Sequence, residues 1–399
     1  MTFLNVSRMI WVASAFICVI HAAAAEGRDK KSPNRPDTAL VAAPASKRTQ
    51  GTESPKPLSS AKSTIAKSVT GDPSSPRILR TALPQIRRSF GGQSSNAFGG
   101  TWFQFTDVYS GSAPTSGANP VVIPAVQFQG VYLGATFATT NASMRTTLES
   151  YLQFLSTSTF LSELSAPYGT STGTALTGKV INVSLPQYSV NSVLVTDLQI
   201  VDYLATNINS ALLTSPTSST VYVVYVEPGV AIDDGSGATS INSFLGYHSS
   251  ADITVTGGAT KTVYYAVIPY PGSPNPTPLS QNFDNVTDEL TAVTSHEIAE
   301  AVTDPDLTTG WQETVRETFT LKLFGWTLFH LSLNYPGEEI GDVPLLLNNY
   351  SKDCYARYSN GYLIQRVIGA DGVTLLTPSG ATPLAASSTM SSRSTVRHK

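Results

Sequence analysis

Two uninterrupted apolar runs constrain the fold of this 399-residue chain more than any other feature. They are TVYVVYV at residues 220–226 and TVYYAVIP at residues 262–269. A strand that is apolar on both faces is buried on both faces, so the runs predict central strands of a covered sheet. Apolar residues at helical spacing in residues 143–164, with a break near 156–159, and in residues 196–213 predict helices that can cover it.

The predicted elements follow the order strand, helix, strand, helix, strand, strand, helix. Residues 121–137 have the composition of a strand pair, and residues 179–185 that of a further strand. Thr196 and Gln199 have the spacing of a capping box, which predicts the start of the second helix. We therefore expect residues 96–385 to form a single α/β (α+β) domain in which helices cover a mixed β-sheet.

The first 25 residues are typical of a secretory signal peptide. Arg8 gives the positive start, residues 9–20 are apolar, and four alanines end the segment. The apolar run has twelve residues, fewer than the roughly 20 that a spanning helix needs. We therefore expect a secreted, extracellular protein with no membrane span in the mature chain. Removal of Cys18 with the signal would leave Cys354 as the single cysteine, so no internal disulfide is expected.

Charge divides the remaining chain into two unlike parts. Residues 26–88 contain 13 Lys and Arg against 5 Asp and Glu, whereas residues 89–386 contain 8 against 23. An acidic folded part disfavours nucleic-acid binding, which requires a basic face. Residues 26–95 are rich in Pro, Ser, Lys and Arg and show no periodicity, so we expect a disordered basic linker or pro-segment there, and a disordered tail at residues 386–399.

Two dibasic pairs, Lys47-Arg48 and Arg87-Arg88, are candidate processing sites in this basic segment. The opposite charges of the two parts favour a cleavable pro-segment, while an uncleaved solvated segment fits the composition equally well. Sequencing the N-terminus of the secreted protein separates the two, because a start near Glu26 excludes cleavage further along.

The segment DELTAVTSHEIAEAVTDPD at residues 288–306 indicates the chemistry. We expect a helix over residues 287–303, because Pro305 pushes the preceding residue out of the helical conformation. His296 and Glu300 then lie one above the other on the same face. In an H-E-x-x-H helix this spacing supplies two zinc ligands, and the intervening glutamate, here Glu297, is the general base. Glu300 replaces the second histidine; a carboxylate also binds zinc, but its charge makes a zinc-bound water harder to ionise.

A third metal ligand has two possible sources. Asp306 lies ten residues after His296, where elongated zinc-protease motifs place their third ligand, although Thr303 occupies the position of the motif's glycine. Alternatively, the later cluster GEEIGD folds back and supplies Glu339 or Asp342. The same acids are also typical of a solvated turn.

The segment HEIAEAVTDPD, followed by Gly310-Trp311 and then EEIGD, resembles the EXORDIUM or phosphate-induced-protein family of secreted proteins. Members of that family pair H-E-[LI]-A-E-x-x-[TS]-[DN]-P with a later E-I-[AG]-D. The stretches VYVVYVEPGVAID, GYHSS and NGYLIQ are also similar, so the resemblance covers roughly residues 125–368. It implies an extracellular zincin-like domain with His296 and Glu300 at the metal and Glu339 or Asp342 as third ligand. His248, in GYHSS, is a candidate for substrate positioning, with an ordinary structural role as the alternative.

The chain departs from this family between Trp311 and the acidic segment. Relatives join the two in a few residues, whereas residues 312–336 intervene here, with an apolar stretch at 319–333 that is too short to span a membrane. Three interpretations fit: an extra hairpin turning at Gly325, an exposed partner-binding patch, or a gene-model error such as a translated intron.

Two functions follow from these patterns. The first is a secreted zinc-dependent metallohydrolase, a peptidase acting on a peptide or protein substrate. The alternative is a non-catalytic extracellular protein with a structural or degenerate metal site, which binds a cell-wall or matrix component. Four glycosylation acceptor motifs agree with an extracellular glycoprotein; they begin at Asn141, Asn182, Asn285 and Asn349.

Overall fold

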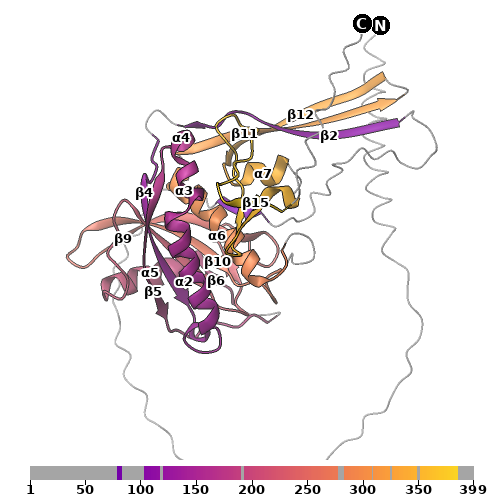
Figure 1. Cartoon of the computed structure of the whole chain (residues 1–399). Helices are drawn as coiled ribbons and strands as arrows, with labels where there is room; N and C mark the ends of the chain where they lie inside the picture. Colours follow the sequence, from indigo (N-terminus) through magenta and orange to yellow (C-terminus); the bar gives the residue numbers. More distant parts are fainter. Residues whose placement is uncertain are drawn as a thin grey trace, which may run out of the picture. The chain divides into compact units, whose positions relative to one another are not determined.

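A six-stranded mixed sheet organises the fold (Figure 1). The computed structural model describes residues 79–82, 103–116, 120–189, 193–276, 283–307, 309–323, 326–347 and 351–384. The predicted signal peptide, the C-terminal tail and most of the basic segment lie outside the described residues. In order across the sheet the strands are β1 (Leu79–Ala82), β9 (Phe244–Thr254), β10 (Thr260–Pro269), β7 (Thr220–Val226), β4 (Ala125–Leu133) and β5 (Ser171–Ile181).

The two apolar runs form adjacent strands, as predicted. They are β7 and β10, which pair in parallel, and every residue of β7 is buried. β4 and β5 continue the parallel pairing, whereas β9 is antiparallel to β10 and β1 is antiparallel to β9. The predicted fold class, α/β (α+β) with a mixed sheet covered by helices, is confirmed at this level.

Two strand predictions and one prediction of disorder need correction. Residues 121–137 form one strand, β4, followed by a short 3-10 helix (Ala135–Ala138), because Gly134, with φ of 125°, redirects the chain. The strand expected at 179–185 corresponds to the end of β5. The first part of β5 contains polar residues, which an edge strand tolerates, so the apolar pattern did not predict its start. Leu79–Ala82 forms β1, so the expectation that nothing in residues 26–95 packs does not hold for these four residues.

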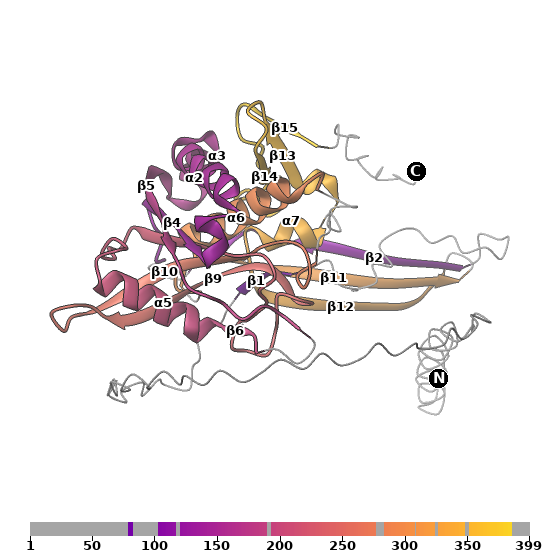
Figure 2. The ribbon, with the colours of Figure 1, turned by 90° about the horizontal axis from the view of Figure 1, so that it is seen from below.

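Helices cover both faces of the sheet (Figure 2). On one face, α2 (Ala142–Thr157), α3 (Thr159–Glu163) and α6 (Val286–Thr303) share a core with strands β4 and β7. The break between α2 and α3 lies at Ser158, as the apolar pattern predicts. A short helix, α4 (Ser165–Tyr168), follows.

The opposite face is covered by α5 (Asp197–Asn209). It begins with the predicted capping box, in which the Thr196 side chain accepts a hydrogen bond from Gln199 N and the Gln199 side chain accepts one from Thr196 N. Short strands β6 (Val195–Thr196) and β8 (Ile232–Asp233) pair beside this helix. No helix in the described part of the chain is long and apolar enough to cross a membrane.

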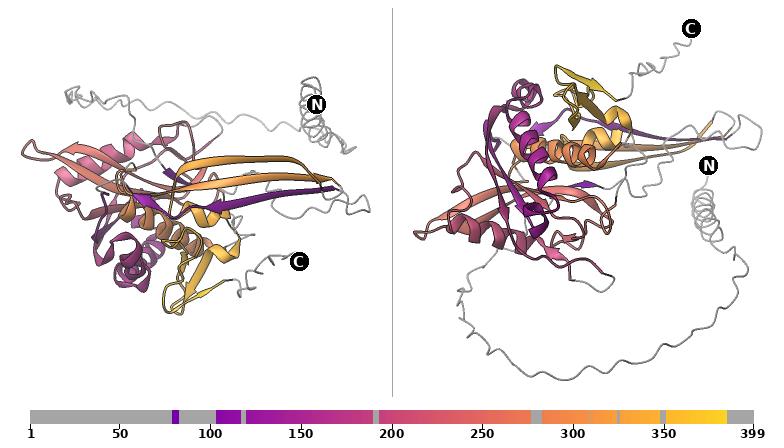
Figure 3. Two further views of the ribbon diagram at one scale, coloured as in Figure 1. Left: turned by 90° about the horizontal axis from the view of Figure 1, so that it is seen from above. Right: turned by 60° about the horizontal axis from the view of Figure 1, so that its bottom comes forward.

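The residues that depart from the resembled family form a long antiparallel hairpin (Figure 3). Its strands are β11 (Trp311–Leu323) and β12 (Trp326–Glu339), and β11 also pairs with β2 (Phe103–Gly111) and β3 (Thr115–Ser116). The predicted turn at Gly325 lies outside the described residues. β12 is an outer strand, and three of its apolar side chains are exposed, namely Phe329, Leu331 and Leu333.

The C-terminal part brings a small sheet against α6. It contains α7 (Asp342–Leu347), a 3-10 turn (Lys352–Cys354), β13 (Tyr355–Tyr358), β14 (Leu363–Gln365) and β15 (Ala381–Pro383). The Ser295 side chain of α6 accepts a hydrogen bond from Gln365 N (2.9 Å), and the Gln365 side chain donates one to the Gly341 carbonyl (2.5 Å). β14 therefore holds the start of α7 beside α6. Cys354 is buried and makes no disulfide.

Candidate metal centre

Helix α6 carries the predicted chemical motif and is almost wholly buried. Asn285 caps its start by accepting a hydrogen bond from Asp288 N (2.9 Å). Asp304 ends it with φ of −142°, outside the helical range, as expected for a residue before proline. The charged residues of the motif are therefore fixed on an ordered helix inside the protein, where ionised groups need compensation.

His296, Glu300 and Asp342 form the first cluster. His296 Nε2 lies 3.1 Å from Glu300 Oε1, its neighbour one turn along α6, and 3.6 Å from Asp342 Oδ1, at the start of α7. One ligand atom from each of the three residues lies within 4.8 Å of the others. Two candidate ligands on one helix and a third from a distant segment thus meet at one point.

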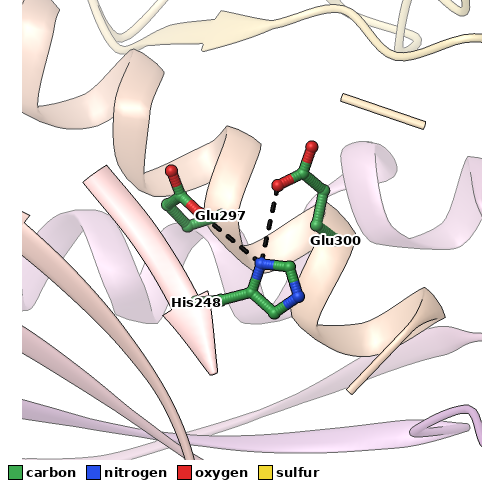
Figure 4. Close-up of side chains that lie close together, drawn as sticks. All are labelled: His248, Glu297 and Glu300. Atoms are coloured by element: carbon green, nitrogen blue, oxygen red, sulfur yellow. Dashed lines mark ion pairs between the residues drawn. The ribbon is translucent and has the colours of Figure 1, made fainter. Parts of the chain in front are cut away.

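His248, on β9, forms the second cluster on the other side of Glu300. Its Nδ1 atom lies 3.6 Å from Glu297 Oε2 and 3.5 Å from Glu300 Oε2. Figure 4 marks both ion pairs with dashed lines. Its other ring nitrogen, Nε2, lies 3.5 Å from Glu339 Oε1, at the end of β12. Glu300 therefore joins the two clusters, with one oxygen toward each histidine.

The donor atoms of both clusters fit a divalent cation. Both carboxylate oxygens of Glu300 and of Glu339 are buried and make no hydrogen bond. Both ring nitrogens of His296 are also buried and make no hydrogen bond. Buried polar atoms are rarely left without a partner, and a bound ion or an ordered water is the usual explanation where they are. Tetrahedral zinc bonds of ~2.0–2.1 Å place ligand atoms about 3.4 Å apart, and the distances of 3.1 and 3.6 Å around His296 bracket this spacing.

The carboxylates determine the electrostatics of the two histidines. Burial alone lowers the pKa of His296, but Glu300, with Glu297 and Asp342, outweighs burial and raises it to about 10. Burial likewise lowers the pKa of His248, and Glu339, Glu297 and Glu300 hold it well above its ordinary value. Without a cation, both imidazoles therefore carry the positive charge that the acids require.

The acids divide between ionised and protonated forms. Burial raises the pKa of Glu300, but the two histidines lower it to about 2, so this carboxylate stays ionised. Burial, together with Glu300, raises the pKa of Glu339 to about 8 and holds that of Asp342 well above its ordinary value. In the absence of a cation, protons thus neutralise part of the negative charge of the cluster. Binding of a cation would release these protons.

Two glycines allow the backbone to approach the cluster closely. A Cβ atom at Gly341 would lie 2.7 Å from Glu300 Oε1 and 2.8 Å from His296 Nδ1. A Cβ atom at Gly246, on β9, would lie 2.9 Å from Glu297 Oε1 and 2.7 Å from a methyl group of Val293. No larger residue fits at either position unless a cluster side chain moves.

The structure brings together six of the seven residues that the sequence singled out as site candidates. They are His248, His296, Glu297, Glu300, Glu339 and Asp342. Asp306, the other possible third ligand, instead accepts hydrogen bonds from Thr309 N (2.9 Å) and the Thr309 hydroxyl (2.8 Å). Of the two remaining acids, Asp342 faces His296, whereas Glu339 faces His248.

His248 lies at the centre of the cluster, although the sequence contains only a weak signal for it. A single histidine beside a tyrosine is usually structural, and only its place in GYHSS, a stretch similar to the EXORDIUM family, indicated a role for it. In the structure its Nε2 atom also lies 3.3 Å from the Asp304 carbonyl oxygen, so it contacts the end of α6 as well as the acids.

Comparison of the chain with protein-family models, with curated proteins and with solved structures gave no match. The resemblance to the EXORDIUM family therefore depends on the motifs alone, and the function has to be argued from the site.

Proposed function

We propose that the protein is a secreted zinc-dependent metallohydrolase, a peptidase built on a zincin-like domain. One observation carries the proposal. His296, Glu300 and Asp342 converge within 4.8 Å, and Glu297 follows His296 on the same buried helix. The motif resemblance and the predicted signal peptide support an extracellular peptide or protein substrate.

Zinc is the cation that we assign to this site, because zinc accepts both imidazole and carboxylate ligands and the motif resembles a zinc-binding helix. One imidazole and two carboxylates provide three protein ligands, and catalytic zinc sites keep a fourth position for water or substrate. Bound zinc would polarise the substrate carbonyl and make water more acidic. Asp342 has the most accessible side chain of the three ligands, at 13% exposure against 0% for His296 and Glu300, so water and substrate would enter beside α7.

Glu297 is the residue we assign to proton transfer. Its Oε1 atom lies 4.0 Å from His296 Nε2, beside the ligand atoms, so it can accept a proton from a water held there. The same carboxyl group can then deliver that proton to the departing amine. His248 is a positioning residue in this assignment, because it contacts Glu297 and Glu300 through one nitrogen and Glu339 through the other.

The variant Glu297→Gln tests this function. It keeps the size of the side chain and removes the base, so hydrolysis of an unfolded protein substrate should fall by about 100-fold or more, while zinc content and the circular dichroism spectrum stay unchanged. Hydrolysis at the wild-type rate by a metal-loaded Glu297→Gln variant would refute the assignment.

The complete burial of the central side chains favours a second candidate function. His248, His296, Glu297 and Glu300 are each 0% exposed, which is typical of a structural metal site closed to substrate. The protein would then be a non-catalytic extracellular protein that binds a cell-wall or matrix component. In that case Glu297→Gln leaves binding of the cell-wall or matrix component unchanged, and neither the wild type nor the variant hydrolyses peptides.

A further inference from the structure

β9 is a strand of the main sheet that contributes a side chain, His248, to the candidate metal cluster. β9 pairs with β10 on one side; on its other side the described residues place β1 alone. The register sets Leu79 opposite His248, Arg80 opposite Tyr247 and Thr81 opposite Gly246. The four residues of β1 thus cover the half of β9 that contains His248, while the half from Ser249 to Thr254 pairs, among the residues that the structure describes, with β10 only.

The half of β9 that β1 covers contacts the proposed catalytic residues directly. His248 contacts Glu297 and Glu300, and the backbone of Gly246 approaches Glu297 as closely as a glycine allows. β1 also lies close to α6. Neighbouring strands are about 4.8 Å apart, so a chain paired to Gly246 and His248 lies one strand beyond residues that contact the cluster.

We propose that the edge of β9 between Phe244 and His248 is the surface that receives an extended peptide, and that β1 occupies it in the full chain as an internal competitor. A sheet edge recognises a peptide through main-chain hydrogen bonds, which any extended sequence can make. The substrate class is therefore an unfolded or extended polypeptide rather than a folded surface. What happens to the bound peptide rests on the proposed function, whereas its binding does not.

Charge complementarity favours β1 as the occupant. β1 belongs to residues 26–88, with 13 basic against 5 acidic residues, and the part it pairs with holds 23 acidic against 8 basic residues. A tethered strand also has an effective concentration of about 1 mM. A free peptide that binds the open edge with a Kd of about 0.1 mM would then bind the full chain about tenfold more weakly.

The test opens the edge without touching the cluster. Arg80→Pro/Thr81→Pro removes two consecutive N–H donors and sets a backbone angle that a paired strand does not accommodate. The matched control, Lys67→Pro/Ser68→Pro, adds two prolines and removes one positive charge in the same segment, outside β1. Both changes are made in full-length protein that also carries Glu297→Gln, so that the probe is not consumed.

The probe is a fluorescein-labelled peptide with the sequence RILRTALP, residues 77–84 of the chain. Fluorescence anisotropy should show about tenfold tighter binding to Arg80→Pro/Thr81→Pro than to the control or the parent. Hydrogen exchange in residues 244–249 should become faster in the same variant alone. Equal peptide affinity in all three proteins, or no binding to the opened variant, would overturn the proposal.

Metal content and hydrolysis separate this proposal from the proposed function. Preferential peptide binding by the opened variant, with no metal and no hydrolysis in the protein with intact Glu297, would refute the hydrolase and support the peptide edge. Zinc-dependent hydrolysis that is unchanged by Arg80→Pro/Thr81→Pro, together with unchanged peptide affinity, would support the hydrolase and refute the role of β1.

Discussion

Gly341→Ala is predicted to weaken the metal site without removing any ligand. The added methyl group would lie 2.7 Å from Glu300 Oε1 and 2.8 Å from His296 Nδ1, whereas ordinary contact begins at 3.4 Å. Gly341 does not adopt a positive φ, so alanine adds no backbone strain there. Relief therefore requires Glu300 to move by about 0.7 Å, or the backbone to carry Asp342 away by a similar distance.

A shift of this size is large for a metal site, where bond lengths vary by about 0.2 Å. Changes beside metal ligands commonly reduce metal affinity by about 10–100-fold, which corresponds to about 1.4–2.7 kcal/mol. We expect a loss in this range when zinc affinity is measured by competition with a chromogenic chelator. The thermal unfolding of the metal-free protein should change much less.

The control for this experiment is Gly369→Ala. A Cβ atom at Gly369 meets Thr374 O at 3.2 Å and Leu376 at 3.3 Å, and no cluster residue lies among its nearest contacts. Its zinc affinity should equal that of the wild type. If Gly341→Ala binds zinc as tightly as the control does, the ligands are not arranged as the structure has them and the reasoning fails.

Two further predictions concern the two histidines and a buried acid. His296→Ala should lose zinc, whereas His248→Ala should keep about one zinc per chain at about tenfold lower affinity; elemental analysis showing the reverse would place the metal between His248, Glu297 and Glu300. Burial raises the pKa of Glu289, which is 2% exposed, from 4.5 to about 8. Between pH 4.5 and 8 the folded state therefore keeps a proton that the unfolded state has already released. The free energy of unfolding falls as pH rises through this window. Glu289→Gln should remove up to about 3 kcal/mol of the loss between pH 5 and 7.5, and parallel urea-denaturation profiles for variant and wild type would contradict this.

Local patterns predicted the elements whose signals are local. The extent of α6, its end before Pro305 and the stacking of His296 and Glu300 all follow from helical spacing and one proline. β7 and β10 follow from continuous apolar runs, and the start of α5 follows from its capping box. Each of these features depends on residues within a few positions of one another.

Features that depend on contacts between distant segments could not be predicted. β5 begins eight residues before its predicted start because an edge strand tolerates alternating polar residues. β1 has no apolar pattern of its own and is defined by its pairing with β9. The choice between Asp342 and Glu339 depends on how β12 and α7 meet α6, and no spacing in the sequence contains that information.

The hairpin of β11 and β12 positions a candidate site residue. Its strands pair along most of their length and end with Glu339 beside His248. In the sequence this segment lies between His296 and Glu300 on one side and the acidic cluster with Glu339 and Asp342 on the other. In the structure the two strands return the chain to α6, so Glu339 and Asp342 both reach the cluster.

Metal content measured by elemental mass spectrometry tests the central claim most directly. The experiment compares purified wild-type protein with His296→Ala and Glu300→Ala, each checked for folding by circular dichroism. The account predicts about one zinc per wild-type chain and the loss of zinc in both variants. A folded wild type that binds no zinc when supplied with it, or variants that retain the wild-type content, would contradict the metal centre and with it the proposed hydrolase.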